Sequence, residues 1–153
     1  MNPEAVAAAM DVALAEADAA VQHGDVPIGA VIVERTTGRI IAARHNEREL
    51  LNDPCAHAEV LALRDAARIV GSWRLDEYAC VVTLEPCPMC AGALVNARIG
   101  AVVFGAGDQK AGALGSVYNL GADPRLNHEF PIQRGLRSED AAALLTAFFT
   151  SRR

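Results

Sequence analysis

The stretch that decides the fold is ACVVTLEPCPMCAGALVNA, residues 79–97, in which an apolar segment runs directly into a proline-marked helix start. Residues 79–84 have the length and the β-branched content of a buried strand. Pro86 cannot continue that strand, and Pro88 suits the first turn of a helix that we predict from Pro88 to Ala97. A strand that passes at once into a helix is the building unit of an α/β sheet.

The segments on either side extend this unit into a larger α/β order. Asn2 and Ser138 are expected to cap helices, and Gly24 is expected to stop the first one. Further helices are predicted over residues 3–23, 57–70 and 138–149, and further strands over 28–34, 39–44, 101–105 and 130–134. The first two of these strands are joined by a short Thr-Thr-Gly turn and form a hairpin. Helices link the next strands, and an irregular Gly-rich stretch precedes the last one. The predicted fold class is therefore α/β, a three-layer α/β/α sandwich with a mixed central sheet of about five strands.

From the length and the composition we predict one domain that spans residues 1–153. The chain is 52% hydrophobic, with a mean hydropathy of +0.16, which is enough for one core and too much for a disordered chain. It holds no uncharged apolar run near the ~20 residues that a membrane span needs. Its start is acidic and lacks the basic residues of a signal peptide. We therefore expect a cytoplasmic protein whose four cysteines are thiols or metal ligands.

The net charge of −5 is unevenly distributed. Residues 1–25 carry five acids and no Lys or Arg, and the rest of the chain has 14 acidic and 14 basic residues. From Arg125 onward there are five Arg and three acids. The overall acidity therefore does not exclude a polyanionic substrate, because the local potential decides binding.

Two short segments contain the residues that are best suited to bind a metal ion or to catalyse a reaction. Cys87 and Cys90 are three residues apart at a predicted helix start, where both sulfurs can face one point. His57 stands at another helix start and adds an imidazole. Two thiolates and one imidazole suit Zn²⁺, and three protein ligands leave the fourth position open for water, as in catalytic sites. Glu59 could reach that water without binding the metal and could act as a proton shuttle.

Other interpretations of these cysteines remain open at this point. Cys55 could provide a fourth ligand and close the site. Cys87 and Cys90 could instead be a thioredoxin-like redox pair, although this leaves His57 without a role. Cys80, inside a predicted strand, is expected in the core.

The combination His57-Ala58-Glu59 and Pro86-Cys87-x-x-Cys90 resembles the signature of the zinc-dependent nucleobase and nucleoside deaminases. The wider sequence is similar to the family of bacterial tRNA-specific adenosine deaminases. This similarity is carried by residues 25–31, 45–46, 53–59, 83–87, 97–105, 112–116, 127–128, 148–149 and 152–153.

The resemblance implies a cytidine-deaminase-like fold and a homodimer that converts the wobble adenosine of a tRNA anticodon loop to inosine. It implies one Zn²⁺ per chain on His57, Cys87 and Cys90, with Glu59 as the catalytic residue. It further implies that Asn46 and the Ala58 backbone contact the flipped base, that Asn127 lies near the nucleotide and that Arg152 lies near anticodon phosphates. These four assignments concern substrate binding.

Two rival functions stay in view. A guanine deaminase, or another deaminase of free bases or nucleosides, could use the same zinc core. The second rival is a zinc-binding interaction module without enzymatic activity. The open fourth coordination position beside Glu59 argues against it, because such a module would not use that position.

Overall fold

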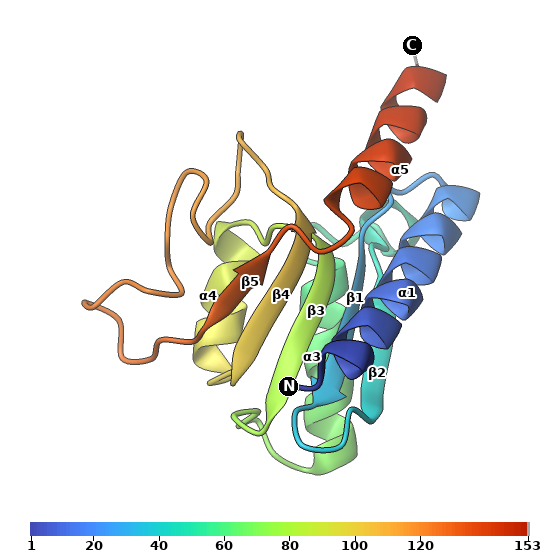
Figure 1. Cartoon of the computed structure of the whole chain (residues 1–153). Helices are drawn as coiled ribbons and strands as arrows, with labels where there is room; N and C mark the ends of the chain where they lie inside the picture. The colour runs from blue at the N-terminus through green and yellow to red at the C-terminus, as the bar shows by residue number, and fades with distance from the viewer. Residues whose placement is uncertain (153) are drawn as a thin grey trace.

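Five strands form one mixed sheet in the order β2-β1-β3-β4-β5 in the computed structural model of the chain, which describes residues 1–152 (Figure 1). The strands are β1 (Gly29–Glu34), β2 (Ile40–His45), β3 (Tyr78–Leu84), β4 (Ala101–Ala106) and β5 (Ile132–Arg134). β1 runs antiparallel to both β2 and β3, whereas β3, β4 and β5 are parallel to one another. The hairpin and the mixed five-stranded sheet were both predicted, and both are confirmed.

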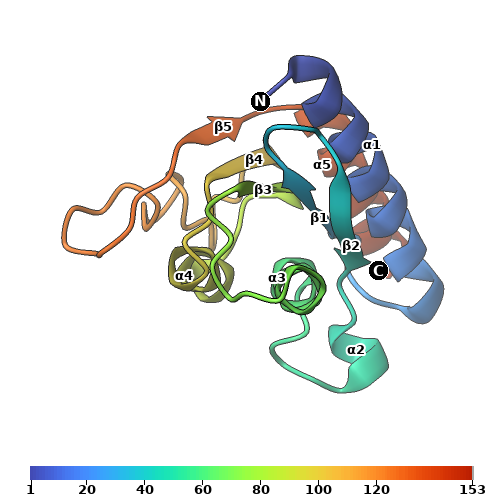
Figure 2. The ribbon, with the colours of Figure 1, turned by 90° about the horizontal axis from the view of Figure 1, so that it is seen from below.

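Helices cover the two faces of this sheet and make three layers. They are α1 (Pro3–Ala20), the 3₁₀ turn η1 (Val21–His23), α2 (Arg48–Leu51), α3 (Ala58–Val70), α4 (Pro88–Asn96) and α5 (Ser138–Ser151). Figure 2 shows α1 and α5 on one face and α3 and α4 on the other. The predicted α/β/α sandwich is thus confirmed, and α3 and α4 begin side by side at one edge of the sheet.

The core lies in two parts, one on each face of the sheet. Ile32 and Phe104 belong to the part beneath α3 and α4, and Val31 and Met10 belong to the part beneath α1. β1 and β3 are buried on both faces, which explains why they appear in the sequence as continuous apolar runs. A Cβ added at Gly29 would lie 1.9 Å from the carbonyl oxygen of Ala13, so α1 packs directly on the backbone of β1.

The structure corrects two details of the predicted elements. Ser138 is the first residue of α5 and not its cap, because Arg137 adopts a left-handed conformation (φ 54°) at the cap position and makes no side-chain cap hydrogen bond. The one-turn helix α2 was not predicted, since its residues have no apolar periodicity. Gly24, at φ 81°, ends η1 as predicted.

The glycine-rich segment 107–129 extends from the sheet as a loop, and its main regular feature is a single bridge between Leu114 and Asn119. Across residues 1–152, no helix has both the length and the apolar content to cross a membrane.

Candidate active site

The site begins where two helices start at the same edge of the sheet. β3 ends at Leu84, and the chain passes through Pro86 into α4 with Cys87 in the N-cap position and extended (ψ 174°). His57 occupies the equivalent N-cap position of α3 (ψ 151°). Neither cap makes a side-chain hydrogen bond to its own helix, so both side chains are free to point toward each other.

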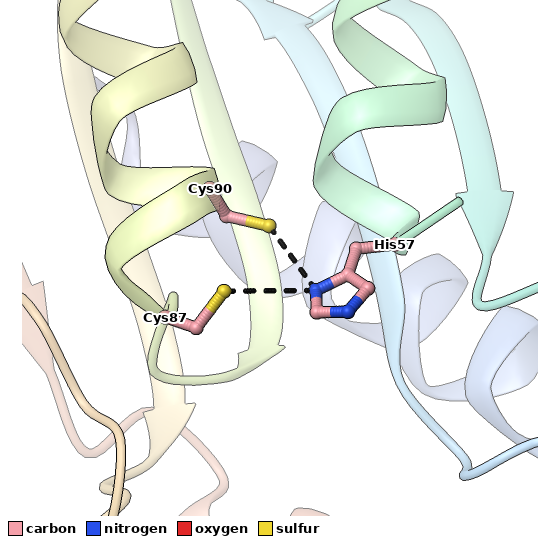
Figure 3. Close-up of side chains that lie close together, drawn as sticks. All are labelled: His57, Cys87 and Cys90. Atoms are coloured by element: carbon pink, nitrogen blue, oxygen red, sulfur yellow. Dashed lines mark hydrogen bonds between the residues drawn. The ribbon is translucent and has the colours of Figure 1, made fainter. Parts of the chain in front are cut away.

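Figure 3 shows the imidazole of His57 facing the sulfurs of Cys87 and Cys90. Its Nδ1 atom lies 3.6 Å from the Sγ of Cys87 and 3.4 Å from the Sγ of Cys90. The three ligand atoms all lie within 4.8 Å of one another, so they can bind one metal ion. The donor set of one imidazole nitrogen and two sulfurs fits Zn²⁺. The structure therefore brings together the three ligands that the sequence predicts.

The electrostatics of the group favour a thiolate. Hydrogen bonds with Cys90, which has the largest effect, and with His57 lower the pKa of Cys87 to about 4. Burial of Cys87 acts in the opposite direction. The same contact with Cys87, together with burial, raises the pKa of Cys90. The hydrogen bond with Cys87 raises the pKa of His57. The lowered pKa favours the thiolate form of Cys87, which is the form that binds a metal.

Glu59 is the second residue of α3 and is only 4% exposed. Burial is the main reason that its pKa is raised, and the charges of His57 and Cys87 and a hydrogen bond with Cys90 also act on it. The carboxylate therefore lies beside the ligand group without being part of it. Ala58, between His57 and Glu59, is fully buried at the first position of the helix.

Asn46 is buried directly after β2, and its side chain forms hydrogen bonds with the backbone of Val26 and of the first residue of α2. Its amide donates to the carbonyl of Val26 at 3.3 Å, and its Oδ1 accepts from the backbone N–H of Arg48 at 3.1 Å. The positive charge of Arg48 acts on His57 and tends to lower the pKa of that imidazole. The Asn46 side chain is thus hydrogen-bonded to the backbone of Arg48, the residue whose charge acts on His57.

Arg152 is exposed after the end of α5, and its guanidinium lies 4.1 Å from the centre of the Phe148 ring. Both residues line a pocket of about 440 Å³ that also includes Val26 and Arg48. Asn127 is exposed on the 107–129 loop. The substrate contacts of Asn127 and Arg152 stay predictions, and Arg153 lies outside the described residues.

The cysteine alternatives can now be compared with the structure. All four cysteines are free. Cys80 is fully buried in β3 and belongs to the core, as predicted. Cys55 is exposed, and the ligand group found among residues 1–152 does not include it. This geometry favours the open, three-ligand site.

Glu85 was not predicted as a site residue, and it organises the loop that follows β4. Its buried carboxylate accepts hydrogen bonds from the backbone N–H of Asp108, Leu114 and Ser116 at 3.0–3.1 Å, and from the Ser116 hydroxyl at 2.5 Å. Burial alone would raise the pKa of Glu85, but these hydrogen bonds lower it. The only signal in the sequence is an acid between a buried strand and Pro86.

The fold and the site are those of a deaminase, and comparison with known families agrees with this class. The family of MafB19-like deaminases matches residues 5–153. A solved structure of a deaminase that performs A-to-I editing at the wobble position of tRNA superimposes with a TM-score of 0.86 and 40% identity, and the match covers 90% of this chain and 99% of that one. A guanine deaminase from Nitrosomonas europaea has a TM-score of 0.79 and 27% identity, over 94% and 84% of the two chains.

Curated relatives show to which family of deaminases the chain is similar. A tRNA-specific adenosine deaminase from Bacillus subtilis is 46% identical over 140 residues, which are 92% of this chain and 86% of the relative. The enzyme of the same name from Haemophilus influenzae is 42% identical over 94% of this chain and 83% of its own length. The chain belongs to the family of tRNA-specific adenosine deaminases.

Proposed function

We propose that this protein is a single-domain enzyme, residues 1–153, that hydrolyses adenosine to inosine at the wobble position of a tRNA anticodon. The observation that carries the proposal is the convergence of His57, Cys87 and Cys90 beside the buried Glu59, in a chain 46% identical to a tRNA-specific adenosine deaminase. Water is consumed and ammonia is released, so the exocyclic amine of adenine is replaced by oxygen.

The cofactor that we propose is one Zn²⁺ per chain, held by His57 Nδ1 and by the sulfurs of Cys87 and Cys90. When bound, zinc acts as a Lewis acid and lets water serve as a nucleophile at neutral pH. The three residues would hold the ion where α3 and α4 begin, at one edge of the sheet. Three ligands leave room for that water.

Glu59 moves the protons of the reaction. Its carboxylate accepts a proton as water adds to C6 of the adenine ring, and it delivers a proton to the ring N1. It then assists the departure of the amino group as ammonia. Its burial keeps bulk water away from the carboxylate, so the proton passes between Glu59 and the substrate.

The substrate contacts that we propose follow from the resemblance and from position. Asn46 and the backbone of Ala58 hold the flipped base near Glu59. Asn127 lies near the nucleotide, and Arg152 approaches anticodon phosphates. An unpaired loop offers such a base at low cost, because it is not held in a duplex.

The alternative is a guanine deaminase, and the similarity to the Nitrosomonas europaea enzyme supports it. This similarity is weaker in identity than the one to the tRNA deaminases, at 27% against 40% in the solved structures. We therefore keep the tRNA substrate as the proposal.

An ammonia-release assay decides between the two. The purified protein is compared on an anticodon stem-loop with adenosine at the wobble position and on free guanine, adenine, adenosine and cytidine. We expect ammonia from the stem-loop alone. Efficient turnover of any free compound, with none on the stem-loop, would overturn the tRNA assignment and leave the deaminase core intact.

A homodimer in the cytoplasm completes the proposal. The exposed side chains of Ile69 (65%) and Trp73 (61%) supply apolar surface for a second copy. The free thiols agree with a reducing compartment. Light scattering on the purified protein tests the dimer, and a mass of one chain would contradict it.

A further inference from the structure

The loop that follows β4 starts at the same edge of the sheet as the proposed metal site. β3 and β4 are parallel, and Leu84 at the end of β3 pairs with Ala106 at the end of β4. The chain after Leu84 leads to Cys87, and the chain after Ala106 forms the 107–129 loop. Open α/β sheets bind ligands beyond the carboxyl ends of their parallel strands. The two segments therefore lie next to each other at the edge where such a fold binds its ligand.

A hydrogen bond ties the loop to the segment that carries Cys87. The backbone N–H of Ala113 donates to the carbonyl oxygen of Pro86 at 2.8 Å, one residue before Cys87. Ala113 and Leu114 are fully buried in the part of the core beneath α3 and α4. Figure 1 shows the loop passing beside the start of α4. The loop is therefore a direct neighbour of the segment that positions Cys87.

Glu85 anchors this loop at two separate points. Its Oε1 atom accepts from the N–H of Asp108 at 3.1 Å, where the loop leaves β4. Its Oε2 atom accepts from the N–H groups of Leu114 and Ser116 at 3.0 and 3.1 Å, and the Ser116 hydroxyl donates to Oε1 at 2.5 Å. Because Glu85 is only 2% exposed, bulk water cannot readily replace these bonds. One carboxylate therefore closes residues 108–116 on themselves.

The loop closes tightly around this carboxylate. A Cβ added at Gly112 would clash with the Cδ atom of Glu85, so only glycine fits there. From another side, Arg134 of β5 donates from Nη2 to the carbonyl oxygen of Leu114 at 3.1 Å. Two charged side chains from outside the loop thus set its conformation, and Glu85 does so through more hydrogen bonds than Arg134.

Beyond these anchors the loop presents two large side chains to solvent. The N–H groups of Val117 and Tyr118 donate to the carbonyl oxygen of Gly112 at 2.9 and 3.1 Å, so residues 112–118 form an ordered turn. The side chain of Val117 is 47% exposed and that of Tyr118 is 54% exposed. Aromatic side chains are among the groups on which proteins stack the unpaired bases of RNA. An ordered turn of this kind, close to the ligand group, can serve as a wall for such a base.

We propose that Glu85 is a positioning residue of the deamination, which holds residues 108–118 as one wall of the pocket that receives the target base. The inference rests on the proposed function, because it takes that pocket to lie at the proposed zinc site. Glu85 acts through the loop and not on the reacting atoms. Without its carboxylate the loop loses its conformation, whereas the metal ligands and the proton shuttle stay in place. A wall that holds the substrate equally well before and in the transition state lowers KM and leaves kcat unchanged.

The variants that test this role separate the side chain of Glu85 from its backbone. The N–H of Glu85 donates to the carbonyl oxygen of Ala106 at 2.8 Å, so the segment before Cys87 stays on the sheet when only the side chain changes. E85Q keeps the size of the side chain and turns one acceptor oxygen into a donor that faces N–H groups. S116A removes a single hydroxyl from the same network. E77Q makes the chemical change of E85Q at an exposed position and is the matched control.

Steady-state kinetics on the stem-loop with adenosine at the wobble position, with zinc content measured alongside, test the proposal. We expect E85Q to raise KM by about tenfold or more, the effect of losing hydrogen bonds to a charged group, and to keep kcat within about threefold of the wild type. S116A, which loses only one bond, should raise KM by about threefold. E77Q should match the wild type in both constants.

A merely structural role for Glu85 predicts a different result. Fewer folded molecules would then lower kcat and zinc content together and leave KM unchanged, and this outcome would overturn the proposal. If E85Q does not fold, S116A decides: a raised KM supports the proposal, and an unchanged KM overturns it.

The same comparison distinguishes this inference from the proposed function. A wild type that deaminates free guanine and not the stem-loop would refute the tRNA substrate. The KM values are then compared on guanine, because the wall receives the base of either substrate. A raised KM in E85Q would still support the positioning role of Glu85, and equal KM values in the wild type and E85Q would overturn it.

Discussion

Replacing Glu59 by Gln separates proton transfer from metal binding. Glutamine keeps the size of the side chain and removes its ability to take up and release a proton. General acid–base catalysis contributes typically about 10²–10⁴ in rate. Because Glu59 is only 4% exposed, bulk water cannot readily replace its carboxylate. We therefore expect turnover on the stem-loop to fall by about 10³–10⁴, equal to roughly 4–5.5 kcal/mol of transition-state free energy.

The same substitution should not harm the fold or the metal. Burial raises the pKa of Glu59, so the ionised form is unfavourable in the folded chain and a neutral amide removes that cost. We expect zinc content near one equivalent and a Tm at or above that of the wild type. E77Q makes the same chemical change at an exposed position and serves as the control. Near-normal turnover in E59Q, or loss of its zinc, would refute the assignment of Glu59 as the proton shuttle.

Three further predictions follow from the site. Cys55→Ala should keep both zinc and activity whereas Cys87→Ala should lose both, and loss of zinc in the Cys55 variant, measured by elemental analysis, would contradict the open site. Glu85→Gln should lower the free energy of unfolding by about 2–4 kcal/mol at neutral pH, because an amide N–H₂ then faces backbone donors. The folded pKa of Glu85 is lowered from 4.5, so the stabilisation by its carboxylate is present above pH 4.5 and is lost as the pH falls through the folded pKa. The difference in free energy of unfolding between the wild type and Glu85→Gln, measured by denaturant titration, should therefore shrink at low pH. A difference that does not change with pH would argue against the role of the carboxylate. Arg152→Ala should weaken stem-loop binding and flatten its salt dependence, as the loss of a phosphate contact does, and an unchanged salt slope would remove Arg152 from the interface.

The order of the elements could be predicted from the sequence because local signals coincide with the tertiary structure. The buried strands β1 and β3 are continuous apolar runs, and Pro3 and Pro88 mark helix starts. The three candidate ligands could be predicted because each lies in the first turn or at the cap of a helix, with Cys87 and Cys90 just after the end of β3. The spacing placed Cys87 and Cys90 near one point, and the resemblance to the deaminase signature added His57 to them.

Other parts of the structure depend on contacts between distant residues and have no local signal. The 107–129 loop is ordered by Glu85, which lies 23–31 residues before the groups that it binds. The hydrogen bond between the rings of His23 and His45 joins positions 22 residues apart on different elements. Helix α2 is a single turn held by Asp25, so its own residues show no helical pattern. Periodicity reveals none of these contacts.

The most direct test of the central proposal is to sequence the product of the reaction, since inosine is read as guanosine. The zinc-loaded protein is incubated with an anticodon stem-loop that has adenosine at the wobble position and with a matched stem-loop in which that adenosine is moved by one nucleotide. We predict conversion to inosine at the wobble position of the first substrate and none in the second. Absence of inosine in both, or equal conversion of both, would contradict the assignment as a wobble adenosine deaminase.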